Sequence, residues 1–349
     1  MNEKQLVIGM PAGSLANPKR GGNLINLLDA AGFKTSGYEN GGPTKFSTVN
    51  FLFGWDGRPQ EFGSQMMLGE LDVAIAGDDW IQERVVELKI EYGEKLELEK
   101  VLSLRRGGVR IVGITNGDDP ADSIEDCLRK LTSEKKLIKV VSEMPYLAVE
   151  WLQEKLKVIG KYDEFSKWSV QKYKTPPKND SGIVVYETWG KTEAKIKNGG
   201  ADIGIEITQS GSALRNYGLK IIDELMMSET GIWINPVIKE NPVKLDLLKM
   251  FLLNLHGTIN AENRVMLLFN VPENKKEIIE RYLSDYNLYA EEPPINPGKS
   301  FAQYSIQVET NNPQIPLAKV RYELIKNGAC SIDTVPLLSS IPDLEVIDI

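Results

Sequence analysis

The chain alternates short apolar segments with segments of helical periodicity. The apolar runs are bounded by Gly, Asn, Asp or Pro, as is typical of buried strands, and the segments between them carry the spacing of amphipathic helices. The predicted strands are 6–10, 72–76, 110–115, 139–141, 183–186, 203–207 and 231–234, and the predicted helices are 22–31, 79–88, 144–157 and 212–217. This alternation predicts an α/β fold with mostly parallel sheets.

The pattern changes at Asn235-Pro236 and Asn241-Pro242, where two proline-containing steps predict a linker. Residues 172–182, rich in Lys, Pro, Asn, Asp and Ser, are predicted to form a surface loop. After the linker we expect helices at 244–255, 274–283 and 315–327 and strands at 264–271, 304–309 and 331–336, with a further strand near 291–295. That order is the βαββαβ arrangement of a small ferredoxin-like domain.

The composition narrows the class of protein. At about 150 residues per domain, 349 residues suggest two or three domains, and the net charge of −8 argues against non-specific nucleic-acid binding. The most apolar helical stretch, 245–255, falls short of the ~18 apolar residues of a membrane span, and the N-terminal apolar run is too short for a signal peptide. Cys127 and Cys330 lie far apart and form no disulfide framework. We expect a cytoplasmic protein with no nucleic-acid and no membrane partner.

The chain has a single histidine, His256. Ser-His-Asp and Cys-His triads and histidine-rich zinc sites need an imidazole as base or ligand, usually more than one. His256 lies next to the join between the core and the C-terminal segment, where a structural or surface role is expected. Any chemistry is therefore predicted to proceed without histidine.

The segment 200–219 carries the most informative polar pattern. A buried strand holds two acids, Asp202 and Glu206, and Ser210-Gly211-Ser212 then opens a helix. Backbone N–H groups at a helix start bind phosphate, serine hydroxyls add donors, and a glycine lets the backbone approach closely. The two carboxylates are candidates to accept hydrogen bonds from ribose hydroxyls. The alternative is an ordinary strand-to-helix connection with serine capping.

A second segment, 71–81, leads a strand into Gly77 and Asp78 before a helix. Its simplest interpretation is a capped turn between strand and helix. Together the two segments predict two lobes that face one another, with a ligand in the crevice at the carboxyl ends of the strands.

Six motifs in order connect the chain to a known family. Residues 201–219 resemble a phosphoribosyl-diphosphate-binding motif in which A-D-A-x-x-D leads into S-T-G-T-T-L and A-N-G-L. Residues 58–61, 69–77, 108–110, 142–145 and 190–194 resemble R-P-Q-D, G-A-A-D-L-G-I-T-G, G-x-C-R, T-E-Y-P and G-S-V-E-A. Residues 270–272 and 324–329 are similar to the C-terminal domain that the longer members of the same family carry. The chain thus resembles, over nearly its whole length, the ATP phosphoribosyltransferases, the enzymes that open histidine biosynthesis.

The resemblance implies a two-lobed catalytic core like that of type II periplasmic binding proteins, followed by a ferredoxin-like (ACT-like) α+β regulatory domain. Lobe I would comprise residues 1–108 and 220–240, lobe II with the phosphoribosyl-diphosphate loop residues 109–219, and the C-terminal domain residues 241–349. The family works as a hexamer built of dimers, uses Mg²⁺ and is inhibited by histidine.

In the implied reaction, N1 of the ATP adenine attacks the anomeric carbon of 5-phosphoribosyl 1-diphosphate, and diphosphate leaves. Such a step depends on alignment and charge neutralisation more than on a base, which suits a chain with one histidine. The resemblance places the donor at Asp202, Glu206, Thr208, Gln209, Ser210, Gly211, Ser212 and Ala213. It gives catalytic roles to Arg58, Arg110 and Glu193, and it assigns to the nucleotide Gly13, Ser14, Asp78, Glu143 and Lys191. The resemblance identifies no metal ligands. For each charged residue, the alternative to a role in the site is an exposed surface position or a helix cap.

The sequence departs from the family near the N-terminus, where P-K-G-R-L is replaced by Pro11-Ala12-Gly13-Ser14-Leu15. Two cations are therefore absent, and Lys19 and Arg20 are the nearest substitutes. The stretch 158–181 is also longer than its family equivalent. These departures leave two alternatives open: a relative that uses the same donor with another acceptor, and a non-catalytic nucleotide-binding regulatory protein of the same fold.

Overall fold

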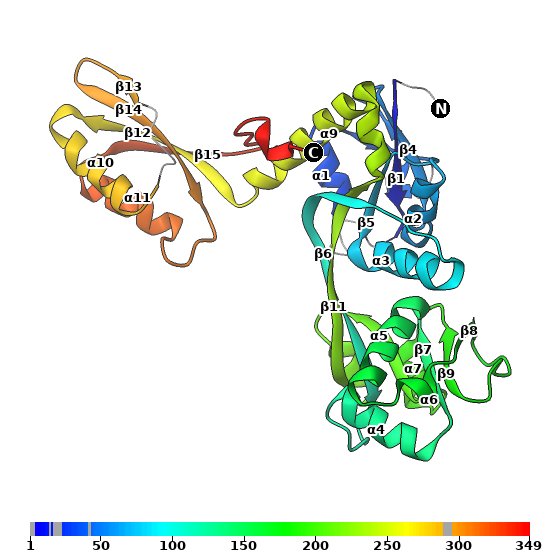
Figure 1. The fold of residues 1–349 in the computed structure, drawn as a ribbon. Coiled ribbons are helices and arrows are strands. Elements are labelled where there is room, and N and C mark those ends of the chain that lie inside the picture. Colours follow the sequence, from blue (N-terminus) through cyan, green and yellow to red (C-terminus); the bar gives the residue numbers. More distant parts are fainter. Residues whose placement is uncertain (1–3, 14, 17–22, 41–42, 289–294) are drawn as a thin grey trace. The chain divides into compact units, whose positions relative to one another are not determined.

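The structure is a computed structural model that describes residues 4–13, 15–16, 23–40, 43–288 and 295–349. The chain forms two compact units, one of residues 1–26 and 34–248 with Ile349, the other of residues 27–33 and 249–348. Each unit has its own principal sheet (Figure 1).

Nine strands of the first unit hydrogen-bond in the order β4-β1-β5-β11-β6-β10-β7-β9-β8. They are β1 (Leu6–Pro11), β4 (Leu52–Gly57), β5 (Val73–Gly77), β6 (Glu99–Asn116), β7 (Leu137–Ser142), β8 (Trp168–Lys172), β9 (Gly182–Glu187), β10 (Ile203–Thr208) and β11 (Leu219–Ile234). A separate pair is formed by β2 (Thr35–Ser36) and β3 (Lys45–Phe46). The helices are α1 (Leu24–Ala30), α2 (Pro59–Met67), α3 (Asp78–Glu87), α4 (Ile124–Glu134), α5 (Pro145–Val158), α6 (Tyr162–Phe165), α7 (Thr192–Lys197) and α8 (Ser212–Asn216).

Two long strands divide this unit into lobes. β6 and β11, of 18 and 16 residues, pair antiparallel, so that one end of the pair lies beside β5 and the other beside β10 (Figure 1). We call the half built on β4, β1 and β5 lobe I, and the half built on β10, β7, β9 and β8 lobe II. The remaining neighbours in both lobes are parallel, as expected where helices connect the strands.

The pairing of β6 with β11 is irregular where the strands pass from one lobe to the other. Register shifts occur at Ser228/Thr230 and Thr230/Gly231, and Arg105 and Gly107 on the facing strand have positive φ. Only glycine fits at position 107, since a Cβ there would lie 2.7 Å from Thr230 Oγ1. Bulges of this kind re-aim side chains and are common next to functional sites.

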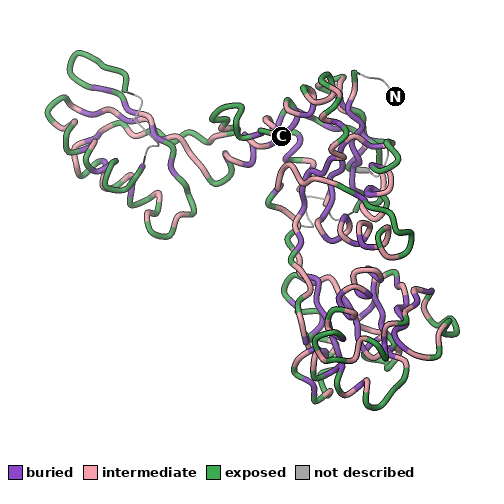
Figure 2. The backbone as a smooth tube through the Cα atoms, viewed as in Figure 1, coloured by how far each residue is buried: buried purple, intermediate pink, exposed green. Residues whose placement is uncertain are grey.

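Burial follows from the layered arrangement. β1 and β5 are buried along their whole length, which explains their uninterrupted apolar sequences, and Figure 2 shows buried positions running along the strands. In lobe II the amphipathic α4 begins after Ser123, whose hydroxyl accepts the N–H of Asp126, and packs Ile124 and Leu128 into the core.

The second unit holds the sheet β13-β14-β12-β15, antiparallel throughout. Its elements are α9 (Pro242–Ala261), which begins in the first unit, β12 (Arg264–Pro272), α10 (Lys276–Asp285), β13 (Ile295–Pro297), β14 (Phe301–Glu309), α11 (Leu317–Lys326) and β15 (Cys330–Pro336). Alternate residues of β14 are buried, and Phe269 and Tyr304 stack in the core with ring centroids 5.7 Å apart. This is the βαββαβ topology of a ferredoxin-like domain, so the predicted fold class is confirmed.

The structure differs from the sequence prediction mainly in the long strands. β6 begins at Glu99 and β11 at Leu219, well before the predicted starts at 110 and 231, because their added segments carry charged residues that hide the apolar period. The edge strand β8 was not predicted, since its buried residues include Ser169 and Gln171. Of the strand expected near 291–295, only Ile295 lies in the described residues, as the start of β13. In the described part of the chain, no helix is long and apolar enough to span a membrane.

Candidate active site

A cavity of about 610 Å³ lies where the two lobes of the first unit meet. Its lining comes from the carboxyl ends of parallel strands in both lobes and from the irregular part of the β6–β11 pair. The residues that carry polar or aromatic chemistry are Arg58, Gln60, Asp79, Trp80, Trp189, Thr208, Gln209, Ser228 and Thr230. This is the position at which α/β folds bind ligands.

The N-terminal segment also reaches this cavity, because β1 ends there. Ala12, Gly13 and Leu15 line the cavity, which supports the placement of Gly13 near a ligand. Ser14, predicted beside it, lies outside the described residues, as do Lys19 and Arg20.

The predicted phosphate-binding segment forms a tight loop between β10 and α8. Gly211 has φ +69°, and its N–H donates to Thr208 Oγ1 at 3.0 Å. The hydroxyl of Ser210 donates to Ser212 Oγ at 3.0 Å, and the guanidinium of Arg215 donates to the Ser210 carbonyl at 3.0 Å. We call residues 208–213 the phosphate loop. Its serines are exposed and its first two residues line the cavity.

The helix that follows the phosphate loop is shorter than predicted. α8 has five residues, so its dipole is small, and the predicted binding of an anion would depend on the amides and hydroxyls of the loop itself. Ala213, in the first turn of α8, contributes no hydroxyl but is exposed beside Ser212.

Asp202 does not lie with the phosphate loop. It precedes β10, where its carboxylate pairs with Lys135 and accepts the N–H of Lys139 at 2.9 Å. Thr208 lies six positions further along the chain, about 20 Å away at the usual rise per residue. The structure therefore removes Asp202 from the predicted ribose site, because Asp202 precedes β10 whereas Glu206 lies within it, towards the phosphate loop.

Glu206 keeps its predicted place near the loop and belongs to a group of three carboxylates. Burial, together with the charges of Glu193 and Glu143, raises its pKa to about 7. Oε1 accepts the N–H of Ile207 at 3.1 Å, whereas Oε2 is buried with no hydrogen-bond partner among the described residues. Burial also raises the pKa of Glu143. The structure thus brings Glu143, Glu193 and Glu206 together at the ends of β7, α7 and β10.

The raised pKa of Glu206 makes the stability of the protein depend on pH. Below pH 4.5 the carboxyl is protonated in both folded and unfolded states, and between 4.5 and about 7 ionisation favours the unfolded chain. We expect Glu206→Gln to be more stable than the wild type at pH 8, by about 1–3 kcal/mol, and equal to it near pH 4.5. Urea unfolding across this range measures the difference. A pH-independent difference, or one that the exposed control Glu154→Gln reproduces, would contradict the assignment.

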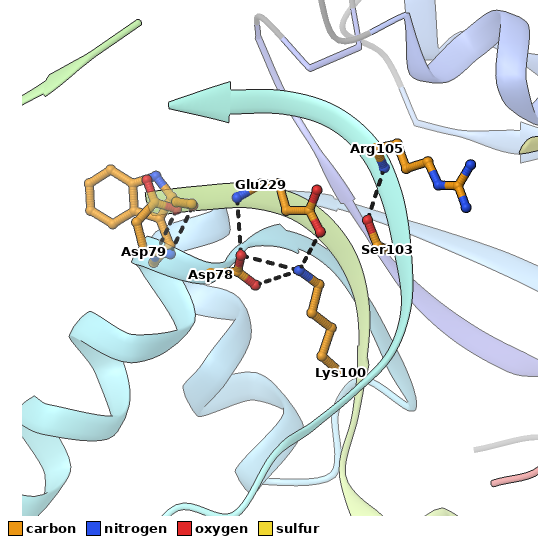
Figure 3. A network of polar contacts seen from close by, with 8 residues as sticks. Asp78, Asp79, Lys100, Ser103, Arg105 and Glu229 are labelled. Atoms are coloured by element: carbon orange, nitrogen blue, oxygen red, sulfur yellow. Dashed lines mark hydrogen bonds and ion pairs between the residues drawn. The ribbon is translucent and has the colours of Figure 1, made fainter. Parts of the chain in front are cut away.

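Two adjacent aspartates at the start of α3 have different surroundings, as Figure 3 shows. The carboxylate of Asp78 pairs with Lys100 at 2.9 Å and accepts the N–H of Glu229 at 3.0 Å, which ties α3 to β6 and β11. Asp79 lines the cavity instead, with its carboxylate folded back over Gly77, and burial raises its pKa. Asp78, the predicted nucleotide contact, therefore lies in an ion pair outside the cavity lining, and its neighbour Asp79 lines the cavity.

The predicted cations occupy three settings. Arg58 is the one cation among the described lining residues of the cavity, and its guanidinium carbon lies 5.8 Å from the ring centroid of Trp189. Arg110 pairs with Thr208 across β6 and β10, yet its guanidinium contacts Glu224 at 3.2 Å. Lys191 is exposed beside Glu193, with Nζ 3.9 Å from its carboxylate. Only Arg58 already faces the cavity.

A second contact joins the lobes beside the Arg58–Trp189 pair. Glu83 of α3 accepts the N–H groups of Tyr146 and Leu147, at 3.0 and 2.8 Å, and so caps the start of α5 in lobe II. Burial raises the pKa of Glu83 to about 8, although the two N–H groups that it accepts act in the opposite direction. Both contacts join lobe I to lobe II.

The residues that sequence reasoning missed arrive from distant parts of the chain. Ser228 and Thr230 lie on the returning strand β11, and the N–H of Asp79 donates to Ser228 Oγ at 3.1 Å. Trp189 directly precedes the Gly190 motif, and Trp80 follows Asp79, so both stood next to recognised segments. No local pattern marks Ser228 or Thr230.

The described residues contain no group of three or more His, Cys, Asp or Glu side chains arranged to hold a metal ion. Glu143, Glu193 and Glu206 are therefore not such a group in this arrangement.

Comparison with known proteins gives consistent matches. The sequence model of a family described as HisG, ATP phosphoribosyltransferase, matches residues 58–256. An ATP phosphoribosyltransferase of Trichlorobacter lovleyi is 27% identical over 345 residues, which cover 95% of this chain and 97% of the relative. One of Desulfatibacillum aliphaticivorans is 28% identical over 289 residues, covering 81% and 82%. Among solved structures, the ATP phosphoribosyl transferase (HisG:HisZ) complex from Thermotoga maritima has 16% identity and a TM-score of 0.48, covering 72% of this chain and 98% of that chain.

Proposed function

Because the chain belongs to the ATP phosphoribosyltransferase family, whose model matches more than half of it, we propose that the cavity between its lobes binds 5-phosphoribosyl 1-diphosphate and ATP. The phosphoribosyl group moves to N1 of the adenine and diphosphate leaves, which is the first step of histidine biosynthesis. The observation that carries the proposal is the phosphate loop, whose first residues open onto a cavity that also exposes Arg58 and two tryptophans.

The donor binds at the phosphate loop in this proposal. Gly211 has no side chain, so that the backbone of the loop can approach the 5-phosphate closely. The exposed hydroxyls of Ser210 and Ser212 supply hydrogen-bond donors for the same phosphate. Glu206 directly precedes Ile207 at the cavity end of β10. It is the remaining acidic candidate to accept hydrogen bonds from the ribose hydroxyls. Its neighbours Glu193 and Glu143 add negative charge beside the ring, which favours a transition state with positive charge at the anomeric carbon.

Arg58 is the first candidate to neutralise the negative charge of the diphosphate. A guanidinium offers bidentate hydrogen bonds to phosphate, and release from the Trp189 ring frees it to do so. Arg110 stands beside the phosphate loop and reaches it by leaving Glu224. These two arginines offset the cations absent at Ala12 and Ser14.

The step needs no side-chain nucleophile, because adenine N1 carries the lone pair that attacks. The protein's contribution is to hold two anionic substrates in line and to exclude water from the anomeric carbon. The contact of Glu83 with the start of α5, which joins the two lobes, serves the second purpose.

Mg²⁺ is proposed to enter with the diphosphate rather than to occupy a resident centre. Mg²⁺ commonly binds through one or two carboxylates plus substrate phosphates, and the described residues form no larger ligand group. The ion supplies neutralising charge when bound. Histidine as inhibitor, acting through the ferredoxin-like domain, and assembly into a hexamer of dimers are proposed on family membership alone.

Omitting each substrate in turn tests the proposed function. We expect diphosphate release from the full-length protein only when both ATP and the donor are present with Mg²⁺. Equal release with the donor alone would show hydrolysis and would contradict transfer to ATP.

Trp189 is proposed to stack on the adenine. Its side chain is 73% exposed although it lines the cavity, and an exposed indole offers a flat apolar face to a purine. We expect Trp189→Ala to raise the KM for ATP about tenfold, since stacking on an aromatic side chain is worth roughly 1–3 kcal/mol, and Trp189→Phe to restore most of the affinity. Initial rates with both substrates varied measure the effect.

The matched control is Trp55→Ala, a half-exposed tryptophan of β4 that does not line the cavity. An equal rise in the KM for the donor after Trp189→Ala would mean that the residue shapes the lobe and does not bind the base.

A further inference from the structure

A second hollow lies in lobe II, at the edge of the sheet opposite to the phosphate loop. It measures about 480 Å³ and is formed by segments that lead into β7, β9 and β10. We call it the lysine hollow, after the charged residues that line it: Lys135, Lys136, Lys139, Lys174, Asp180 and Asp202. It belongs to neither the cavity nor the phosphate loop, which lie at the other ends of the same parallel strands.

Positive charge is in excess in the lysine hollow. Four lysines meet two aspartates, and Asp202 is already committed to Lys135 and to the N–H of Lys139. Within the described residues no carboxylate forms an ion pair with Lys136, Lys139 or Lys174. This gathering of cations stands out in a chain whose net charge is −8.

The position of Lys174 is fixed by its surroundings. Its backbone has φ +64°, and its Nζ lies 5.5 Å from the ring centroid of Tyr173, which Lys195 Nζ approaches at 5.4 Å. The Tyr173 hydroxyl packs over Gly200, where a Cβ would come within 2.2 Å of it. The loop that follows β8 is thus packed on the turn before β10, and the longer stretch 158–181 helps to wall the hollow.

We propose that the lysine hollow binds a small phosphate-rich anion, carrying a diphosphate or triphosphate chain, at a site distinct from the proposed active site. Ammonium groups on flexible stems neutralise such a chain without demanding one geometry. None of the described residues that line the hollow is aromatic, so recognition rests on the phosphates and not on a base. Free polyphosphate and the triphosphate of a nucleotide share this chemistry.

Lysine acetylation of the full-length protein, followed by mass spectrometry, locates the site. With inorganic tripolyphosphate at constant ionic strength, we expect labelling of Lys136, Lys139 and Lys174 to fall at least threefold. Exposed Lys45 and Lys157 should be unchanged; Lys157 is a matched control, because its Nζ also lies over a tyrosine ring, 4.9 Å from Tyr162. Uniform protection, or none at the three lysines, overturns the proposal.

Substitution then tests whether the lysines bind the anion. In calorimetry with tripolyphosphate, the variant Lys136→Gln/Lys139→Gln/Lys174→Gln should lose one binding site that the control Lys45→Gln/Lys157→Gln keeps. The three residues are exposed, so the fold should tolerate the change. Unaltered stoichiometry overturns the proposal. A further labelling experiment replaces tripolyphosphate with ATP. Equal protection of the three lysines by the two anions would assign recognition to the phosphate chain, and stronger protection by ATP would assign the site to a nucleotide. Both results support the proposal.

Discussion

Gly211→Ala is expected to lower kcat/KM for 5-phosphoribosyl 1-diphosphate about a hundredfold. The residue has φ +69°, where a side chain costs roughly 1–2 kcal/mol, so alanine would pull the phosphate loop away from the geometry that joins Thr208 to Gly211. Misplaced amides and hydroxyls would then lose a charge-assisted contact with the 5-phosphate. Initial-rate kinetics and calorimetry with the donor measure the loss.

Gly160→Ala separates backbone strain from function. Gly160, after α5, has φ +70°, and no neighbouring atom lies within 4 Å of the place that an alanine methyl group would take, so alanine there imposes the same strain away from the cavity. We expect both variants to lose similar stability and only Gly211→Ala to lose donor affinity. Equal donor affinity in the two variants would mean that the phosphate loop does not hold the 5-phosphate.

Arg58→Ala is expected to reduce kcat/KM by a factor of about 10²–10³, the usual effect of removing one group that stabilises developing negative charge. Arg58 begins α2 from the end of β4 and is the one cation among the described lining residues of the cavity. Arg58→Lys should recover part of the loss, because it keeps the charge and gives up bidentate bonding. Single-turnover measurement of diphosphate release isolates the chemical step.

The control for Arg58 is Arg129→Ala, an exposed arginine of α4 whose partner is Asp126. It should leave the rate unchanged. If Arg58→Ala raised only the KM for ATP and left single-turnover release intact, Arg58 would be a nucleotide contact and the diphosphate would be neutralised elsewhere.

The sequence was sufficient for the features that are encoded locally. Periodicity predicted both the α/β core and the ferredoxin-like unit, and the run from Thr208 to Ala213 predicted a loop whose tight turn at Gly211 the structure contains. These features depend on neighbours within a few residues, where backbone preferences and the burial period act directly.

The sequence was insufficient where the place of a residue depends on the direction of its side chain or on its distance from the other residues of the site. Asp202 precedes β10 and Glu206 lies within it, so that one acid is beside Lys135 and the other is towards the phosphate loop. Asp78 and Asp79 are adjacent, and the turn of α3 sends one to Lys100 and the other to the cavity. In both pairs the side-chain directions depended on tertiary contacts.

Other parts of the site come from chain segments that meet only in the fold. Ser228 and Thr230 reach the cavity because β11 returns beside β6 with a shifted register, and no local pattern announces such a bulge. Trp189 became visible only as an exposed ring opposite Arg58.

The central claim is that this cavity joins the phosphoribosyl group to ATP. Full-length protein incubated with ATP, isotopically labelled 5-phosphoribosyl 1-diphosphate and Mg²⁺ should form phosphoribosyl-ATP and diphosphate in equal amounts, with the label on the adenine nucleotide by mass spectrometry. Calorimetric binding of the donor without any labelled nucleotide, under conditions in which ATP also binds, would contradict it.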